Sequence, residues 1–377
     1  MPTAAILNSR QSKTPVGDDA WVVSTLAAVR HAVDSGLTLL SSVGLNTWEL
    51  VTWGAGQYGG QLGLYIPCPF GDTICGSSGF RSDNCQLIAE TICREFELHP
   101  ARIDFYFHGA SQTQKTRKAL WPERDRAIIA AAEVIYPVAI RPKGNLEQLL
   151  AVDAQGKTVD ERFRVRYEHR AGRHSPPVSV SQSAALAATG WPCITHWTCS
   201  ANGKWPGETA AAYYRDLARP GNANPRSALA TLARILSEQQ IRATSVHIRG
   251  GYRVISFTAL PPGEAINLMR WRKRFVRWNF EPYGIAIRAD AARASGVRPV
   301  MYGVPDDYAR LDVSDQPFFQ NRGVRGGDWT PEHEWRHLGD LDLSRIPADA
   351  LKVVVRSPDD IDRVRQGANS EILPLYA

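Results

Sequence analysis

The 377-residue chain lacks any long uninterrupted apolar run. No stretch approaches the roughly 18 consecutive apolar residues that a membrane-spanning helix requires. The first fifteen residues, MPTAAILNSRQSKTP, also lack the continuous apolar core and the small-residue cleavage site of a secretory signal. We therefore expect no membrane association and a cytoplasmic location.

Cysteine is scarce, and its spacing excludes two classes of small protein. The six cysteines stand at positions 68, 75, 85, 93, 193 and 199. They form neither a series of metal ligands nor a dense disulfide framework, and cytosolic thiols stay reduced. Cys193, His196 and Cys199 lie close together, but a fourth zinc ligand is missing and the spacing fits no common structural site. No metal site is predicted, although a metal role for these three residues stays open.

The chain is long, carries a net positive charge and has many tryptophans. Its length suggests two or three domains with buried cores. The 44 Lys and Arg residues outnumber the 38 Asp and Glu residues, which gives a net charge of +6 and favours a polyanionic partner. The 11 tryptophans offer flat rings that, beside arginines, can stack on nucleic-acid bases.

Apolar and amphipathic segments alternate through the first part of the chain. In the first amphipathic segment, apolar residues recur at helical spacing, and Gly36 is a plausible C-terminal cap. The order predicts a helix over 18–35, a strand over 37–43, a helix over 45–54, a strand over 62–67, a helix over 86–96 and a strand over 102–107. This alternation is typical of right-handed βαβ units.

The stretch WPERDRAIIAAAEVIYPVAIRPKGNLEQLL combines basic residues, a helix and a strand. Pro122 predicts a turn, which would place Arg124 and Arg126 at the N-terminus of an alanine-rich helix. An apolar strand follows over 134–140, and Arg141 opens a Pro-Lys-Gly turn into a second helix. Helix N-termini bind anions, and ligands of open α/β sheets sit outside the carboxyl ends of strands, so these arginines indicate a phosphate site. The alternative is an ordinary helix–strand unit of any α/β domain.

The same stretch resembles the DNA-processing A (SMF) family, within the wider SMF and LOG group. The resemblance is carried by the order aromatic–Pro–x–Arg–x–Arg–x–Ile–Ile, an alanine-rich turn, an apolar strand and Gly–x–Leu. It implies a Rossmann-like domain that holds nucleic-acid phosphate. A small-residue loop forms the phosphate site in that group, and this chain has Ser41, Ser42 and Gly44 at that place. Glu49 is then either a ribose-binding acid or a first-turn carboxylate favoured by the helix dipole.

The LOG-type phosphoribohydrolase motif, with two adjacent glycines, a Gly-Thr pair and a glutamate, is absent. Its absence counts against a nucleotide hydrolase of that type.

The second half predicts a mixed α+β domain. A strand over 193–198 would place His196 on the face opposite Cys193 and Trp197. An amphipathic helix follows over 227–239 with Ser227 as its N-cap, and a strand-rich section ends over 253–258.

This order resembles the ADP-ribosyltransferase-like fold, including DarT-like domains, and later segments are similar to the AbiGi type of abortive-infection protein. The resemblance is carried by a His-x-Thr strand, a Ser-Phe-Thr strand, Tyr-Gly-Ile and Glu-His-Glu-Trp-Arg. It implies that Glu334, or failing that Glu332, stabilises charge on a nicotinamide ribose that His196 orients, in a cleft completed by Ser256 and Tyr283. NAD is the cofactor that it implies. The alternative for the glutamate stretch is a strand with an internal Glu–Arg pair.

The segment 264–288 interleaves cations with aromatic rings. Arg270, Trp271, Arg272 and Trp278 belong to it, together with four further basic residues. Cations contact phosphate and flat rings stack on bases, so the pattern indicates a nucleic-acid surface. An amphipathic helix with a buried aromatic face is the alternative.

These patterns together predict a Rossmann-like SMF/LOG domain over 1–155, a linker over 156–189 and an ADP-ribosyltransferase-like domain over 190–377. The expected function is that of a nucleic-acid-directed enzyme of bacterial defence or DNA modification, with DNA favoured over RNA. The alternative is a nucleotide-signal sensor whose second domain is not catalytic. A homo-oligomer, the substrate and the reaction stay open.

Overall fold

The computed structural model describes residues 1–12, 15–68, 83–109, 117–168, 190–219, 226–246, 248–272, 277–323 and 328–376. The chain divides into two compact units. Unit 1 comprises Met1–Arg173 and Glu208–Pro225, and unit 2 comprises His174–Gly207 and Arg226–Ala377. Unit 1 thus receives a short segment from the second half of the sequence.

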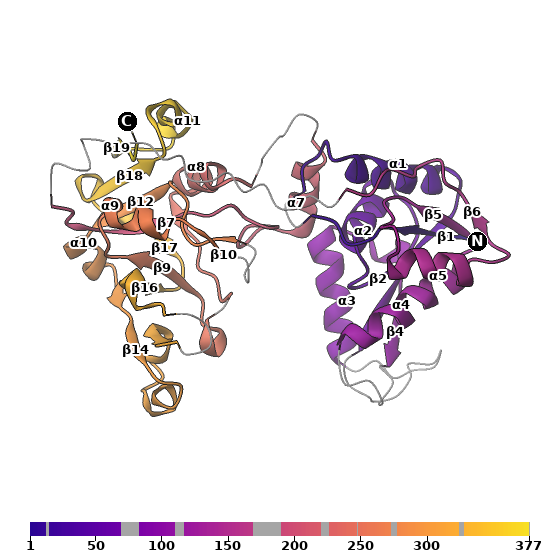
Figure 1. Ribbon diagram of the computed structural model, residues 1–377, viewed down its shortest axis with the longest axis horizontal. Coiled ribbons are helices and arrows are strands. Elements are labelled where there is room, and N and C mark those ends of the chain that lie inside the picture. Colours follow the sequence, from indigo (N-terminus) through magenta and orange to yellow (C-terminus); the bar gives the residue numbers. More distant parts are fainter. Residues whose placement is uncertain are drawn as a thin grey trace. The chain divides into compact units, whose positions relative to one another are not determined.

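Within the described residues, unit 1 is built on a six-stranded parallel sheet in the order β4–β3–β2–β1–β5–β6 (Figure 1). The strands are β1 (Thr3–Leu7), β2 (Thr38–Ser42), β3 (Leu62–Cys68), β4 (Ile103–Gly109), β5 (Val134–Pro137) and β6 (Thr158–Val159). The chain moves outward from β1 to β4 and then crosses to the other side of β1. This reversal of direction is the feature that creates a ligand crevice in Rossmann-like sheets.

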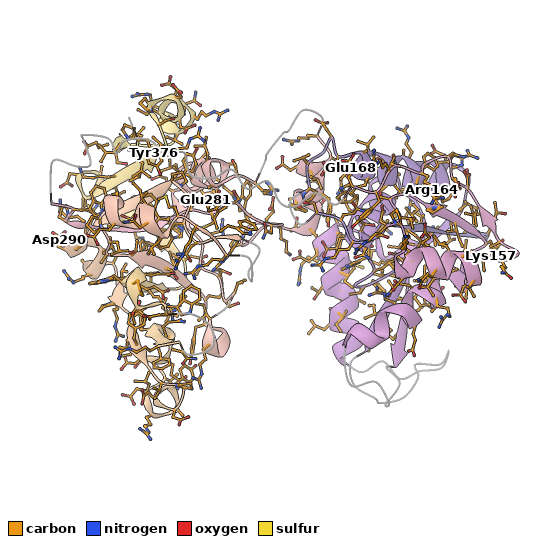
Figure 2. All side chains as sticks on the ribbon, in the orientation of Figure 1. Lys157, Arg164, Glu168, Glu281, Asp290 and Tyr376 are labelled. Atoms are coloured by element: carbon orange, nitrogen blue, oxygen red, sulfur yellow. The ribbon has the colours of Figure 1, made fainter. Side chains whose placement is uncertain are left out.

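Helices cover both faces of this sheet. They are α1 (Ala20–Asp34), α2 (Trp48–Gln57), α3 (Asp83–Phe96), α4 (Arg117–Ala131), α5 (Asn145–Asp153) and α7 (Ala210–Leu217), with the 3₁₀ turn η1 (Pro100–Arg102). One core joins the sheet to α1, α2, α3 and α7, and a second core joins the opposite face to α4 and α5. Lys157, labelled in Figure 2, secures the end of α4 by donating to the carbonyl oxygens of Ala130 and Ala132, each at 2.6 Å.

Local sequence signals account for most of these elements. The α1 helix buries Val22, Ala28 and Val29 at helical spacing and ends at a glycine, Gly36, with a φ of 70°. A left-handed residue after a helix favours glycine because it has no Cβ. The predicted helix over 18–35 is therefore confirmed, and α2, α3 and β2 to β4 also lie where the apolar pattern places them.

The expected start of α4 is wrong. The turn predicted at Pro122 does not occur, because α4 begins at Arg117 and both Arg124 and Arg126 lie in its interior. A proline inside a helix removes one backbone hydrogen bond and costs about 3 kcal/mol. Burial of Ile128 and Ile129 further along α4 supplies tertiary packing that overrides this local preference.

The described part of unit 2 contains a seven-stranded sheet in the order β13–β16–β9–β7–β12–β18–β19. Its strands are β7 (Cys193–Trp197), β9 (Val254–Thr258), β12 (Gly284–Arg288), β13 (Arg298–Pro299), β16 (Glu334–Leu338), β18 (Leu351–Val355) and β19 (Glu371–Pro374). All neighbours are antiparallel except β18 and β19. Unit 2 is thus a mixed α+β unit, and its likeness to ADP-ribosyltransferases stays a prediction.

Shorter elements complete unit 2. The short strand pairs are β8 (Gln240–Ile241) with β17 (Leu341–Asp342), β10 (Trp271–Arg272) with β11 (Arg277–Trp278), and β14 (Met301–Gly303) with β15 (Phe319–Asn321). The helices are α8 (Ala228–Glu238), α9 (Pro262–Ala265), α10 (Ala289–Ala294) and α11 (Ile361–Arg365). The 3₁₀ turns are η2 (Arg249–Gly251), η3 (Ile266–Leu268), η4 (Asp307–Arg310), η5 (Gln316–Phe318), η6 (Thr330–Glu332), η7 (Leu343–Arg345), η8 (Ala348–Ala350) and η9 (Pro358–Asp360).

Two expectations for unit 2 have opposite outcomes. Ser227 caps α8 as predicted, because its side chain accepts a hydrogen bond from the backbone of Ala230 at 3.1 Å. A single amphipathic helix over the basic–aromatic segment is wrong, since its described residues form α9, η3, the hairpin β10–β11 and β12. Among the helices that the structure describes, none is long and apolar enough to cross a membrane.

Candidate functional site

The strand order of unit 1 reverses at β1, between β2 and β5. The loops after β1, β2 and β5 all leave the sheet at this edge, and α2 and α5 begin there. In open α/β sheets ligands bind at such a switch point. The residues of these three loops are therefore the first candidates for a ligand site.

Asn8 ties the three loops together. Its side-chain amide is fully buried, and its Nδ2 donates to the Oγ1 of Thr25 and to the Oγ1 of Thr47, each at 3.0 Å. Its Oδ1 accepts from the backbone N–H of Ala139, in the loop after β5, at 3.2 Å. Ser9 adds a further link, because its Oγ accepts from the backbone of Arg141 at 2.8 Å. The edge is thus held rigid by bonds between segments far apart in sequence.

Thr47 precedes α2 in a left-handed backbone conformation and does not cap the helix. Its φ of 62° is left-handed, which is strained for a β-branched residue and typical of functional sites. Its hydroxyl accepts from Asn8 and makes no capping bond to the helix. The first-turn N–H groups of α2 consequently lack a side-chain acceptor at the N-cap, and such groups bind phosphate.

Glu49, in the same first turn, accepts a hydrogen bond from the hydroxyl of Tyr214 on α7 at 2.8 Å. This pairing occupies one oxygen of the carboxylate that was considered for ribose binding. The pKa of Tyr214 is raised, first by burial and then by the neighbouring Glu49.

Gly44, in the loop before α2, lies close to the side chain of Arg124. Gly44 has a φ of 86°, and a Cβ at this position would lie 3.0 Å from Nη1 of Arg124. The Nε and Nη2 atoms of Arg124 donate to Asp125 at 3.0 and 2.7 Å. Within the residues described, Nη1 has no hydrogen-bond acceptor and lies against the loop. Arg124 is not at the start of α4, but its side chain reaches Gly44 in the loop that was predicted to bind phosphate.

The other predicted phosphate-binding residues of unit 1 are placed differently. Ser41 and Ser42 are buried in β2, and neither Oγ has a hydrogen-bond partner in the described part of the chain. Arg141 is exposed in the loop after β5. Arg126 points elsewhere, because its Nε pairs with Asp153 at the C-terminus of α5 at 3.2 Å. The structure thus brings Gly44 and Arg124 together but does not bring Arg126 to them.

In unit 2, Glu334 forms an internal ion pair. Its two carboxylate oxygens accept from Nε and Nη2 of Arg336 at 2.8 and 3.0 Å. Only 3% of the Arg336 side chain and 11% of the Glu334 side chain are exposed. Arg336 also donates to the carbonyl oxygens of Pro317 and Phe319. Ser256 donates to Glu334 at 2.7 Å, so this predicted pair of site residues is in contact.

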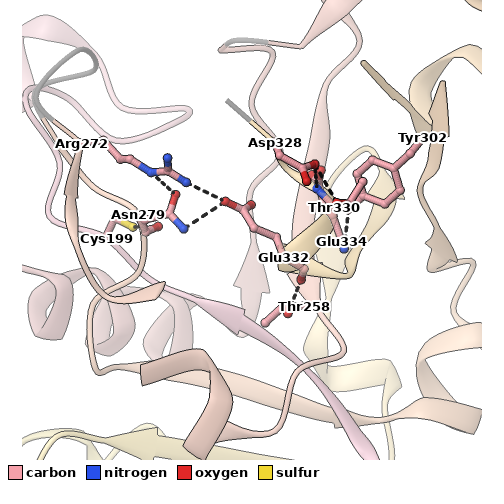
Figure 3. Close-up of polar contacts among 9 residues, drawn as sticks. All are labelled: Cys199, Thr258, Arg272, Asn279, Tyr302, Asp328, Thr330, Glu332 and Glu334. Atoms are coloured by element: carbon pink, nitrogen blue, oxygen red, sulfur yellow. Dashed lines mark hydrogen bonds and ion pairs between the residues drawn. The ribbon is translucent and has the colours of Figure 1, made fainter. Parts of the chain in front are cut away.

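Glu332 stands two residues before Glu334, and its side chain points toward Arg272 and Asn279 (Figure 3). Its Oε1 accepts from Asn279 at 3.0 Å and lies 3.5 Å from Nη2 of Arg272. His333, between the two glutamates, has a left-handed φ of 44° and separates the turn η6, which ends at Glu332, from the strand β16, which begins at Glu334. Burial raises the pKa of Glu332, and the negative charge of Glu334 adds to this effect.

The raised pKa of Glu332 predicts a specific dependence of stability on pH. The folded protein holds this proton more tightly than the unfolded chain, whose glutamates titrate near 4.5. The stabilisation is therefore present below that value and is lost as pH rises through the folded-state pKa. Glu332→Gln should remove this loss, so that the variant gains stability relative to the natural protein between about pH 4 and pH 8 in urea unfolding. A constant difference across that range would contradict the assignment.

His196 and Tyr283 lie apart from Glu334. The strand registers place Glu334, Ser256 and Thr195 on one face of the sheet and His196 on the other. The Nδ1 of His196 is 2.9 Å from the carbonyl oxygen of Ser256, and burial lowers its pKa. Tyr283 donates to Asp360 at 3.0 Å within the core of the His196 face. The four predicted catalytic residues are therefore not gathered in one place.

The hairpin β10–β11 concentrates positive charge and aromatic rings. Trp271 pairs with Trp278, at 6.0 Å between ring centroids, and Arg272 pairs with Arg277 across the strands. Burial lowers the pKa of Arg272, and the charge of exposed Arg270 lowers it further. Like charges placed directly opposite destabilise a hairpin, and the carboxylate of Glu332, 3.5 Å from Nη2 of Arg272, supplies a counter-charge.

The cysteines and buried acids near the hairpin show no catalytic pattern. Burial raises the pKa of Cys199 to about 12, which keeps its thiol protonated and poorly nucleophilic. Glu281, labelled in Figure 2, accepts from the hydroxyl of Ser200 at 2.9 Å, and burial raises its pKa. In the described ranges, no group of three or more His, Cys, Asp or Glu side chains is placed to hold a metal ion.

No protein-family model and no curated protein sequence matches the chain. Among solved structures, DNA processing protein A from Streptococcus pneumoniae aligns at 15% identity and a TM-score of 0.28, over 42% of this chain and 49% of that chain. DNA processing protein A from Helicobacter pylori has the same identity and TM-score, over 42% and 64%. The Moco carrier protein of Chlamydomonas rheinhardtii aligns at 15% and 0.25, over 45% and 77%. The match thus spans about half of the pneumococcal protein, and scores this low assign no function.

Proposed function

We propose that unit 1 binds the phosphate groups of nucleic acid at the carboxyl edge of β1 and β2. The observation that carries this proposal is the meeting of three features at one place: the uncapped first turn of α2, the left-handed loop at Gly44 and the Nη1 atom of Arg124. The N–H groups and the helix dipole favour a negative charge, and a guanidinium adds geometric specificity.

The polymer, rather than a free nucleotide, is favoured by the charge of the whole chain. A net charge of +6 attracts a polyanion over its length. The basic hairpin of unit 2 is a second candidate contact, with Arg270, Arg272, Trp271 and Trp278 as the residues involved. DNA is the expected polymer, and a homo-oligomer is compatible with this proposal.

Arg124→Gln tests the phosphate site. Glutamine can still bond to Asp125 but carries no charge, so the helix should remain folded while the phosphate contact is lost. We expect weaker oligonucleotide binding, and a slope of log affinity against log salt that is smaller by about one unit. The measurement is fluorescence anisotropy at several salt concentrations.

Arg126→Gln is the matched control, because Arg126 lies on the same helix, is exposed and pairs with Asp153 away from the edge. We expect this variant to keep the salt slope of the natural protein. Equal slopes for both variants would refute the assignment of the phosphate site to Arg124.

For unit 2, the Glu334–Arg336 pair favours the hypothesis of a non-catalytic module, because both carboxylate oxygens are committed to a buried guanidinium. A base-modifying or NAD-dependent reaction in bacterial defence stays a prediction. It would need Glu332 or another group to take the role first expected of Glu334.

A further inference from the structure

Arg124 and Asp125 are neighbours on α4 whose side chains form a largely buried ion pair. Only 13% of each side chain is exposed. The Nε and Nη2 atoms of Arg124 both donate to the same oxygen, Oδ1 of Asp125, at 3.0 and 2.7 Å. Two bonds to one acceptor hold the planar guanidinium in a fixed orientation, because it cannot rotate without breaking one of them.

This orientation decides which nitrogen of Arg124 faces the phosphate loop. Nη1 is the nitrogen that Asp125 does not bind, and it is the atom that would lie 3.0 Å from a Cβ at Gly44. Oδ2 of Asp125 likewise makes no hydrogen bond within the described ranges. An anion that binds Nη1 therefore meets a guanidinium whose charge is already shared with a carboxylate.

The charges of the pair largely cancel each other. Burial raises the pKa of Asp125, and Arg124 is the charged group that opposes this rise. The positive potential left for a ligand comes mainly from the first turn of α2, which is equivalent to about half a unit charge. That potential suits one negative charge better than two, because the cost of removing an anion from water grows with the square of its charge, whereas the attraction grows in proportion.

We propose that Asp125 sets the charge of the phosphate group that the site accepts. It positions Arg124 and, by cancelling most of its charge, favours a singly charged phosphodiester over a doubly charged terminal phosphate. The inference rests on the proposed function. It deepens that function by naming the residue through which the site selects linkages inside a chain over chain ends and nucleoside monophosphates.

Thymidine 5′-phosphate and its methyl ester test this selectivity. They share base and sugar, and at about pH 8 they differ by one charge, because a phosphomonoester loses its second proton near about pH 6. We expect the natural protein to bind the ester on the order of tenfold more tightly in titration calorimetry, since the second charge of the monoester lies a few ångströms from the carboxylate.

The same titration at about pH 5 separates charge from shape. Both ligands are then singly charged, so the difference between their affinities should disappear. A difference of the same size at both pH values would come from the methyl group and would overturn the role of Asp125.

Two substitutions separate the charge of Asp125 from its positioning of Arg124. Asp125→Asn keeps an oxygen that can accept from Arg124 but removes the charge, so it should bind the monoester on the order of tenfold more tightly and lose the preference for the ester. Asp125→Ala also removes the acceptor, so its affinity for both ligands should fall below that of Asp125→Asn. Asp153→Asn is the matched control, because Asp153 pairs with Arg126 of the same helix at 3.2 Å, and it should keep the natural preference.

The outcomes distinguish this inference from the proposed function. If the natural protein binds both ligands equally, or if Asp125→Asn, folded by its melting curve, keeps the natural preference, the role of Asp125 is refuted and the phosphate site stands. If the natural protein binds neither ligand, this inference is refuted. An Arg124→Gln variant with unchanged oligonucleotide binding then refutes the phosphate site as well.

Discussion

Glu334→Gln is expected to destabilise unit 2 by about 3–5 kcal/mol, because it leaves the guanidinium of Arg336 buried without its counter-charge. Only 3% of that side chain is exposed, so water cannot replace the lost carboxylate. A carboxylate that serves only catalysis would behave differently, since its removal leaves the fold intact. The measurement is urea unfolding, with hydrogen exchange to locate the change in unit 2.

Glu371→Gln is the control for this variant. Glu371 pairs with Lys352 on the same sheet, but 58% of its side chain is exposed. Exposed pairs contribute about 0–1 kcal/mol, so we expect little effect. A Glu334→Gln protein as stable as the Glu371→Gln protein would refute the structural role and return Glu334 to the catalytic candidates.

Asn8→Ala is expected to have the largest effect in unit 1. It removes a hydrogen-bond partner from Thr25, from the partly buried Thr47 and from the buried backbone N–H of Ala139. Thr25 still donates to the carbonyl oxygen of Trp21, whereas the N–H of Ala139 is left unsatisfied, so we predict a loss of about 1–3 kcal/mol. The loops at the carboxyl edge also lose the hydrogen bonds through which Asn8 connects them, so phosphate binding should fall as well.

The control is Gln11→Ala, which removes an amide from the same loop. Among the described residues, Gln11 donates to the carbonyl oxygens of Ser9 and Ala139, and its side chain is partly buried. We expect a loss of about 1 kcal/mol, as for a typical hydrogen bond. Faster hydrogen exchange in β1 and α2 of the Asn8 variant alone would confirm the tie. Equal stability of the two variants would show that Asn8 does not hold the edge.

Elements with a local signal were the ones that the sequence could predict. The helices α1 and α8 show helical spacing of apolar residues. Gly36 follows the end of α1 and Ser227 caps the start of α8, as predicted. The strands β2, β3 and β4 are short apolar runs between turns. For these elements the physical cause lies within a few residues, in periodic burial and in caps.

The central strand of unit 1 escaped prediction. β1 contains only Thr3–Leu7, too short a run to distinguish from any apolar terminus. It becomes the centre of the sheet because β2 and β5 pair with it from both sides, and β5 is about 130 residues away. The helix α7 likewise joins unit 1 from the second half of the chain, where Tyr214 reaches Glu49. Neither pairing has a signal within its own segment.

The candidate site likewise contains residues that the sequence indicated and residues that only the structure revealed. Sequence resemblance indicated Gly44 and Arg124, whose residue types suit a phosphate loop. Asn8 and Thr47 were missed, because their role consists of hydrogen bonds across 39 and 131 residues. Arg126 looked equivalent to Arg124, but the two side chains leave α4 in different directions and only Arg124 reaches the loop.

The sequence alone determined the residue types, the alternation of helix and strand in unit 1 and the placing of charge and tryptophan in one segment of unit 2. Only the tertiary structure decided that His196 and Glu334 lie on opposite faces of a sheet, and that Glu334 is bound to Arg336. The physical reason is that the side-chain period of a strand fixes which residues share a face only once the register with its neighbours is set. That register depends on the burial of two separate cores, which no local pattern contains.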